Sequence, residues 1–292
     1  INLKKCLHRN LKSPTSYISM KAIQFTVPVF GENLFALLED KGPDFYNYYH
    51  RHEQLQITYI LKGKGTIMIG NAIQSFAEDD VFILKPNEPH MLDRYADKEH
   101  AAEDSIHAIH LFIDMERMDK LFQFPDFEEL KAFFLAMDVS KRMEASVAVA
   151  WKPYFLQLLQ LSGIPRFGVF INLLHEIYLL QDAAVPLLLG FKRLNYSDKD
   201  GERISSVLKY TFDNYADDIP IPAVAAIVHM TPTGFCKYFK KHTMKTYVEF
   251  LNEVRIEKAC QLLLNKRGES IAEVGFKVGF NTIVHFNRVF KK

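Results

Sequence analysis

Two stretches near the C-terminal end of the chain repeat one pattern, and this repeat constrains the fold more than any other feature of the sequence. The first is IPAVAAIVHMTPTGFCKYFKKH, which begins at Ile221, and the second is SIAEVGFKVGFNTIVHFNRVFKK, which begins at Ser270. In each stretch small and apolar residues precede a turn, and the following segment carries two phenylalanines four residues apart. Two short helices joined by a tight turn form a helix-turn-helix unit. The repeat therefore predicts two such units in an all-helical domain.

Turn and capping residues locate the helices of both units. Thr231 is an N-cap residue followed by proline, so the second helix of the first unit is expected over residues 232–241. In the second unit Gly279 supplies a left-handed turn, and Asn281 is expected to cap the last helix. The apolar residues of 246–265 recur on one side of a helix, which predicts one long helix connecting the two units.

Charge is distributed unevenly along the chain. Residues 219–292 contain 12 Lys and Arg against 5 Asp and Glu, a net charge of +7, whereas the rest of the chain contains 24 against 30, a net charge of −6. A basic domain behind an acidic body favours contact with a polyanion such as DNA. On charge alone, a merely solvated basic face stays open as the alternative.

The motifs in this region resemble the C-terminal domain of the AraC/XylS family of bacterial transcription regulators. The resemblance is carried by VRIEKACQLLL from Val254, SIAEVGFKVGF from Ser270 and HFNRVFKK from His285, and it covers residues 200–292. It implies a double helix-turn-helix whose two recognition helices enter successive major-groove segments on one face of DNA. It also implies double-stranded promoter DNA as a partner and RNA polymerase as a further candidate partner.

The resemblance assigns DNA-contacting positions residue by residue. The candidates for reading bases are Thr233, Gly234 and Lys237 in the first unit and Asn281, Thr282, Asn287 and Arg288 in the second. The candidates for phosphate contacts, which position a protein without reading sequence, are Lys240, Lys241 and Lys291. Ile283 and Val284 stand where members of the family often carry polar residues. We therefore expect backbone and thymine-methyl contacts from the second unit more than hydrogen-bonded readout.

The N-terminal part of the chain favours short β-strands separated by turns. Strand-like apolar runs occupy residues 22–30, 54–61, 66–69, 81–84 and 106–113. Strands at this spacing are typical of a sandwich or small barrel, which we expect over residues 20–113. Residues 1–19 lack hydrophobic periodicity and are expected to be a disordered or non-native tail.

Three histidines indicate a ligand site in this region. Two of them open the segment HRHEQLQITYILKGKG, which begins at His50, and the third follows the turn PNEP. The layout resembles the two motifs of a cupin barrel, and cupin sensor domains are common at the N-terminus of AraC-type regulators. Strand alternation and this resemblance give the predicted ligand-binding set: His50, His52, Gln56, Thr58 and His90. Apolar contact to a small polar effector is expected from Tyr48, Tyr59 and Phe112.

A metal site is the alternative use of the same histidines. His50, His52 and His90 could bind a divalent ion through three imidazoles. Metal-binding cupins usually add a carboxylate to the set, and here that position is Gln56, a poor ligand. We therefore expect no metal and no other cofactor.

Residues 114–199 favour helices between the two domains. Apolar residues recur at helical spacing in segments 127–134, 151–159 and 167–180. The last segment is apolar over more than one face, so a surplus face that includes Ile177 predicts either a homodimer or burial within the chain. Residues 194–201, rich in Asn, Ser, Asp and Lys, predict a linker.

Composition excludes several protein classes. A chain that is 48% hydrophobic and 24% charged is globular rather than disordered, collagenous or coiled-coil. The three cysteines, Cys6, Cys236 and Cys260, lie too far apart for a zinc finger or a disulfide framework. The longest apolar stretches are too short or too interrupted for the ~20 residues that span a bilayer. We expect a cytoplasmic protein without a membrane partner.

Together these features predict a multidomain α+β protein. It comprises a cupin-like sensor barrel (20–113), a helical dimerisation and linker region (114–199) and a double helix-turn-helix (200–292). Our hypothesis is an effector-responsive transcription regulator and not an enzyme, because no paired acid and base or activated nucleophile occurs at recognisable spacing. A metal-dependent cupin enzyme with an appended nucleic-acid-binding domain is the alternative. A regulator that responds only through a protein partner is a third interpretation.

Overall fold

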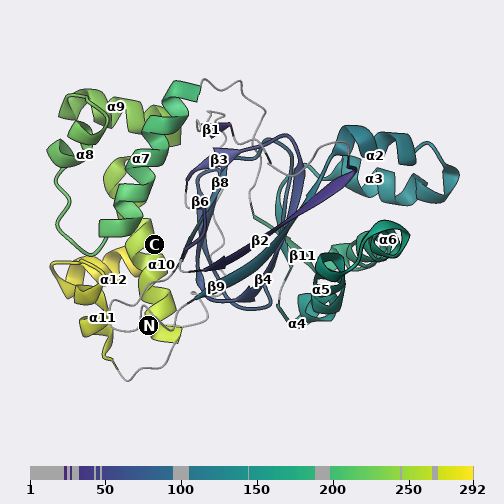
Figure 1. The fold of residues 1–292 in the computed structure, drawn as a ribbon. Coiled ribbons are helices and arrows are strands. Elements are labelled where there is room, and N and C mark those ends of the chain that lie inside the picture. The colour runs from purple at the N-terminus through teal and green to yellow at the C-terminus, as the bar shows by residue number, and fades with distance from the viewer. Residues whose placement is uncertain are drawn as a thin grey trace.

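The computed structural model describes residues 23–24, 27, 33–42, 44–46, 48–94, 105–143, 145–187, 198–243, 245–264 and 269–291. The predicted tail over residues 1–19 and most of the predicted strand over 22–30 lie outside these residues. Within the described chain, two β-sheets are followed by helices, and a helical C-terminal domain packs against one of the sheets (Figure 1). The α+β organisation predicted from the sequence is confirmed.

The larger sheet, sheet B, has the strand order β11-β10-β7-β4-β9-β2. Its strands are β2 (Phe35–Gly42), β4 (Leu55–Lys62), β7 (Val81–Leu84), β9 (Ile106–Ile113), β10 (Lys141–Met143) and β11 (Ala184–Pro186). The pairings are antiparallel, and β4 lies between β7 and β9. The apolar runs predicted over 54–61, 81–84 and 106–113 are three of these strands.

The smaller sheet, sheet A, has the order β1-β3-β8-β5-β6. Its strands are β1 (Ile23–Gln24), β3 (His50–Arg51), β5 (Gly65–Ile69), β6 (Ala72–Phe76) and β8 (His90–Arg94). The two sheets face each other, because apolar side chains of both form one buried cluster between them, among them Ile60 and Phe82 of sheet B with Ile67 and Leu92 of sheet A.

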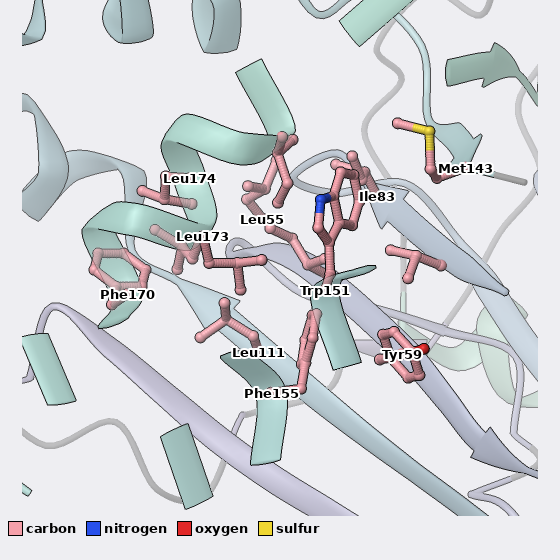
Figure 2. Packing of buried hydrophobic residues seen from close by; sticks show 14 of the residues in the cluster. Leu55, Tyr59, Ile83, Leu111, Met143, Trp151, Phe155, Phe170, Leu173 and Leu174 are labelled. Atoms are coloured by element: carbon pink, nitrogen blue, oxygen red, sulfur yellow. The ribbon is translucent and has the colours of Figure 1, made fainter. Parts of the chain in front are cut away.

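Helices cover the outer face of sheet B. They are α2 (Met115–Leu121), η1 (Pro125–Phe127), α3 (Glu128–Ala136), α4 (Ala145–Ala148), η2 (Val149–Trp151), α5 (Lys152–Gln160), α6 (Gly163–Leu179) and η3 (Gln181–Ala183). Strand β4 turns Leu55 and Tyr59 toward these helices, where Trp151 and Phe155 meet them (Figure 2). Ile177 of α6 is fully buried in the same cluster. The prediction that Ile177 lies on a surplus face is therefore wrong for this residue, which packs inside its own chain.

The C-terminal domain is helical throughout its described residues. It contains α7 (Asp198–Asn214), α8 (Ile221–Ile227), α9 (Pro232–Thr243), α10 (Tyr247–Leu264), α11 (Ile271–Lys277) and α12 (Ile283–Lys291). The predicted long helix corresponds to α10, which we call the connecting helix. Because α7 begins at Asp198, the linker predicted over 194–201 is wrong at its C-terminal end, and residues 194–197 lie outside the described residues.

The caps of these helices explain where they begin. Ser270 and Glu273 form a reciprocal capping box at the start of α11. Gly279 adopts a positive φ of 92°, as the predicted left-handed turn requires. Asn281 does not cap the last helix. Instead the hydroxyl of Thr282 accepts a hydrogen bond from the amide of His285, so the cap lies one residue later than predicted.

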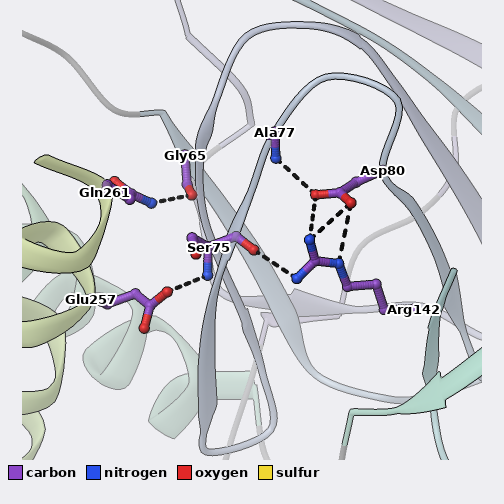
Figure 3. Close-up of polar contacts among 7 residues, drawn as sticks. All are labelled: Gly65, Ser75, Ala77, Asp80, Arg142, Glu257 and Gln261. Atoms are coloured by element: carbon purple, nitrogen blue, oxygen red, sulfur yellow. Dashed lines mark hydrogen bonds and ion pairs between the residues drawn. The ribbon is translucent and has the colours of Figure 1, made fainter. Parts of the chain in front are cut away.

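The connecting helix packs against the outer face of sheet A. Lys258, which is 2% exposed, forms an ion pair with Asp93 of β8 at 2.9 Å. Glu257 accepts a hydrogen bond from the amide of Ser75 on β6 at 2.6 Å, and the Gln261 amide donates to the Gly65 carbonyl on β5 (Figure 3). An edge strand exposes unpaired backbone groups, and here helix side chains satisfy some of them. The two domains are therefore held together by contacts of α10 with sheet A as well as by the covalent connection between them.

Candidate effector site and nucleic-acid interface

The structure brings the three predicted histidines together between the sheets. His50 on β3 and His90 on β8 are paired residues of adjacent strands, and their rings lie 4.4 Å apart. His52 follows β3, and its ring lies 5.1 Å from that of His90. One ring nitrogen of each histidine lies within 4.8 Å of the others. We call these three residues the histidine cluster.

Backbone carbonyls fix the proton positions in the cluster. The Nδ1 atoms lie 2.7, 3.0 and 2.8 Å from the carbonyl oxygens of Tyr48, Gln54 and Glu88, for His50, His52 and His90 respectively. A carbonyl oxygen can only accept, so in each neutral ring Nδ1 carries the proton. Each Nε2 is then left with a lone pair. The cluster therefore offers three unprotonated imidazole nitrogens.

Burial keeps the cluster neutral near pH 7. Burial lowers the pKa of His50 to about 3 and the pKa of His52 to about 4. The pKa of His90 is also lowered well below its ordinary value, first by burial and then by the neighbouring His50 and His52. A buried imidazolium would lack the water that stabilises its charge, and the neighbouring groups do not replace that stabilisation.

Gln56 links the cluster to a second polar group. Its Oε1 lies 2.7 Å from Nε2 of His52 and 3.1 Å from Nε2 of His90, while its Nε2 lies 2.8 Å from the Thr58 hydroxyl. Thr58 and Gln56 also contact Nδ1 of His110. The predicted ligand-binding set did not include His110, which lies on β9 opposite Thr58. His110 points into the site, where it contacts Gln56 and Thr58. Alternation along residues 106–113 could have identified it, had the pairing of that strand with β4 been known.

The geometry of Gln56 admits two chemical solutions. An Oε1 that faces two imidazole lone pairs is unfavourable, because all three atoms are acceptors. If the amide is rotated by half a turn, its NH₂ group donates to both histidines and its oxygen accepts from Thr58. A cation between the lone pairs is the other solution, with His50, His52 and His90 as ligands and Gln56 as a weak fourth donor.

The predicted apolar contacts fall in different places. Phe112 lies 5.2 Å from the ring of His52 and lines the site. Tyr59 does not, because it points to the opposite face of β4, packs on Phe155 and donates to Asp79. Tyr48 is exposed and contacts Tyr46, whose ring in turn lies 5.0 Å from that of His50. The structure thus places Tyr46, which the sequence prediction omitted, at the edge of the cluster.

The C-terminal domain carries two helix pairs of the same design. Thr231 caps α9 through the amide of Gly234, just as Thr282 caps α12 through that of His285. Phe235 and Phe239 of α9 are buried, and Phe286 and Phe290 of α12 take the same positions in their own cluster. We call α9 and α12 the recognition helices.

The predicted DNA-contacting residues lie on the surface of these helices. The exposed ones are Thr233, Lys237, Lys240, Lys241, Asn281, Thr282, Arg288 and Lys291, and the half-buried ones are Gly234 and Asn287. Sheet A does not cover them, since they keep this exposure with the sensor sheets in place. Both recognition helices therefore present an accessible surface that carries basic side chains.

Two protein-family models match this chain, one in each domain. Residues 34–99 match the model of the AraC-like ligand binding domain, and residues 224–292 match the model of the helix-turn-helix domain. Both matches support an AraC family regulator with an N-terminal ligand-binding domain. The residues that match the AraC-like ligand binding domain contain the histidine cluster. Those that match the helix-turn-helix domain contain both recognition helices and all of α8 except its first three residues.

Several known proteins are similar to this chain. The HTH-type regulator YfiF of Bacillus subtilis is 22% identical over 268 residues, which cover 87% of this chain and 82% of YfiF. An HTH-type regulator from the cgkA 5' region of Pseudoalteromonas carrageenovora is 39% identical over 89 residues, which cover 30% of this chain and 52% of that relative. The chain thus spans about half the length of the latter relative. The crystal structure of ToxT from Vibrio cholerae O395 aligns over 88% of this chain and 93% of ToxT, with 11% identity and a TM-score of 0.35.

Among the described residues, no helix is both long and apolar enough to cross a membrane.

The lowered pKa values predict a loss of stability in mild acid. In the unfolded chain a histidine protonates near pH 6.5, whereas His52 in the folded protein stays neutral until about pH 4. Between these values the unfolded state binds more protons than the folded state. As the pH is lowered, the free energy of unfolding should therefore fall by up to about 1.4 kcal/mol per pH unit for each such histidine. Urea denaturation between about pH 7 and pH 5 measures this slope, which should be shallower in His52→Gln. His107→Asn is the control, because His107 faces outward beside Glu39. Equal slopes for His52→Gln and the unmodified protein would refute the assignment.

Proposed function

We propose that this AraC family regulator binds promoter DNA in a sequence-specific manner under the control of a small polar effector. The observation that carries the proposal is the pair of exposed recognition helices, which have matching threonine caps and matching buried phenylalanines. The same chain holds the histidine cluster separately, between its two sheets. The effector binds at the histidine cluster. The proposed role is binding rather than catalysis.

Strand alternation supplies a route from the effector to the DNA-binding domain. On β8, His90 points between the sheets, and the next residue, Met91, points outward into a buried cluster with α7 and α10. Beside β3, Tyr49 lies in the same cluster, and its amide donates to the Ser205 hydroxyl of α7 at 3.0 Å. An effector that shifts His50 or His90 therefore moves the strands on which the DNA-binding domain rests.

We further propose a homodimer formed through α5 and α6. Ile164 is 87% exposed, and Leu156, Leu161 and Phe167 are also exposed large apolar residues on or beside these two helices. Monomeric proteins rarely leave such residues grouped on adjacent helices. A second copy of the chain would cover this face while leaving the recognition helices accessible.

Placing a charge on this face should separate the proposed dimer. Ile164→Asp should give folded monomers, because a carboxylate cannot be buried unpaired at an apolar contact. Light scattering measures the mass, and Glu116→Asp serves as the control, because it keeps the charge of an exposed residue of α2, outside α5 and α6. An unchanged mass for soluble Ile164→Asp protein would remove α6 from the interface.

DNA binding should weaken steeply with salt. Each phosphate contact contributes a slope of about −0.9 to the dependence of log affinity on log salt concentration, because binding releases condensed counterions. Lys241→Ala should therefore make the slope shallower by about one contact, whereas Lys131→Ala on α3 should leave it unchanged. Fluorescence anisotropy on duplex DNA at several salt concentrations measures both. An affinity independent of salt would rule out the proposed DNA-binding function.

Effector binding should require the histidine cluster. A metabolite present at about 100 times its dissociation constant adds about 2.7 kcal/mol to the stability of the form that binds it, which a melting-temperature screen of small polar metabolites detects. His52→Ala should abolish the shift produced by any hit, whereas His107→Ala should preserve it. Elemental analysis that finds close to one equivalent of zinc, iron or nickel would replace this metal-free proposal with a metal site.

A further inference from the structure

The matching caps align the two recognition helices position by position. Thr231 and Thr282 each accept a hydrogen bond from the amide three residues later. Counting from these caps, the second residue of α9 is Thr233, and the second residue of α12 is Val284. The same count pairs Lys237 with Arg288. The two helices thus carry side chains of nearly identical shape at their second position but differ there in one hydroxyl.

Among the described residues of α12, Val284 is the exposed apolar residue that packing within the chain does not explain. Its side chain is 75% exposed. Its neighbour Ile283 is half-buried and packs against the cluster formed by α10, α11 and α12, so Ile283 has a structural role. A branched apolar side chain in the first turn of a recognition helix lies among the residues that meet base edges in a helix-turn-helix complex.

The chemistry of valine limits what it can read. A valine side chain has neither donor nor acceptor, so it cannot distinguish bases by hydrogen bonds. In the major groove the apolar group on a base edge is the C5-methyl of thymine, whereas the edges of G, C and A present donors and acceptors. If Val284 lay against a donor or acceptor of a base, it would displace the water bound there without replacing its hydrogen bond, which would weaken binding. Thr233 keeps a methyl group and adds a hydroxyl, so the same constraint does not apply to α9.

We propose that Val284 is a specificity-determining residue that selects a thymine, through its C5-methyl group, in the half-site bound by α12. The proposal rests on the proposed DNA-binding function and adds to it the base that one helix requires. It also makes the two half-sites unequal, because α9 carries threonine at the equivalent position. The DNA site is therefore directional.

Removal of a methyl group from either partner tests the contact. A duplex that the full chain binds is first selected from a random-sequence pool, and each thymine is then replaced in turn by deoxyuridine, which lacks only the C5-methyl. Loss of one buried methyl corresponds to about a fourfold weaker affinity. We expect one thymine whose replacement weakens binding of the unmodified protein by about this factor. Val284→Ala should bind about as weakly and should no longer respond to that replacement.

Controls separate this contact from general effects on binding. Val284→Ala preserves the fold, because the side chain is exposed and alanine favours a helix. Val149→Ala removes an exposed valine far along the chain, on the helices that cover sheet B, and should keep the full deoxyuridine response. Val284→Thr restores the shape of the side chain and adds the hydroxyl of Thr233. It should recover the response to the thymine methyl only in part, because threonine keeps a single methyl group and its hydroxyl also tolerates other bases.

The outcomes distinguish this proposal from the function on which it rests. If salt-dependent DNA binding occurs and no thymine shows a deoxyuridine effect that Val284→Ala abolishes, the thymine contact is wrong and the DNA-binding function stands. If Val284→Ala binds as tightly as the unmodified protein, Val284 does not read DNA. If no duplex is selected in a salt-dependent manner, both proposals fail together.

Discussion

The two-residue alternation of a β-strand is the constraint on which this structure depends. Strands β5, β6 and β8 of sheet A face sheet B with one set of side chains and the C-terminal domain with the other. His90 and Leu92 therefore point into the space between the sheets, while Met91 and Asp93 contact α7 and α10. A polar cluster suited to an effector and a docking surface for the DNA-binding domain thus share a single strand, with no element between them. Because one residue's shift in register would exchange the two faces, the site and the docking surface are specified together.

Polar contacts determine how the connecting helix lies on the sheet. Lys258 is buried, faces Asp93, and lies near the rings of Phe212 and Tyr215 of the α7 region. From Glu257 a chain of hydrogen bonds continues through the backbone of Ser75 to Arg142 of β10, which holds Asp80 (Figure 3). Arg142 belongs to the region that also carries α5 and α6. The connecting helix α10, strand β6 of sheet A and strand β10 of sheet B are therefore joined through one polar network. Loss of Arg142 would remove the ion-pair partner of the buried Asp80 carboxylate.

The sequence predicted the features that depend on local signals. Thr231, Gly279 and the spaced phenylalanines located the helix-turn-helix units, because caps and turns act within a few residues. The grouping of His50, His52 and Gln56 followed from alternation along one segment. Other features depend on which surfaces meet. Ile177 is apolar whether a second subunit or its own chain covers it, and the structure shows that its own chain does. Glu257, Lys258 and Gln261 would suit a solvated helix face equally well, yet all three are buried against sheet A. His110 joined the site only when the partner of β4 was known.

The buried ion pair between the two domains offers the most direct test of this account. A double-mutant cycle with Lys258→Met and Asp93→Leu, followed by urea denaturation of the full chain, measures whether α10 rests on sheet A in solution. Either single change removes the ion-pair partner of the remaining charge at this contact and should lower the free energy of unfolding by about 3 to 5 kcal/mol. The double change should recover most of that loss. If the two effects instead add to within about 0.5 kcal/mol, the residues do not interact, and α10 does not rest on sheet A through this ion pair as the account requires.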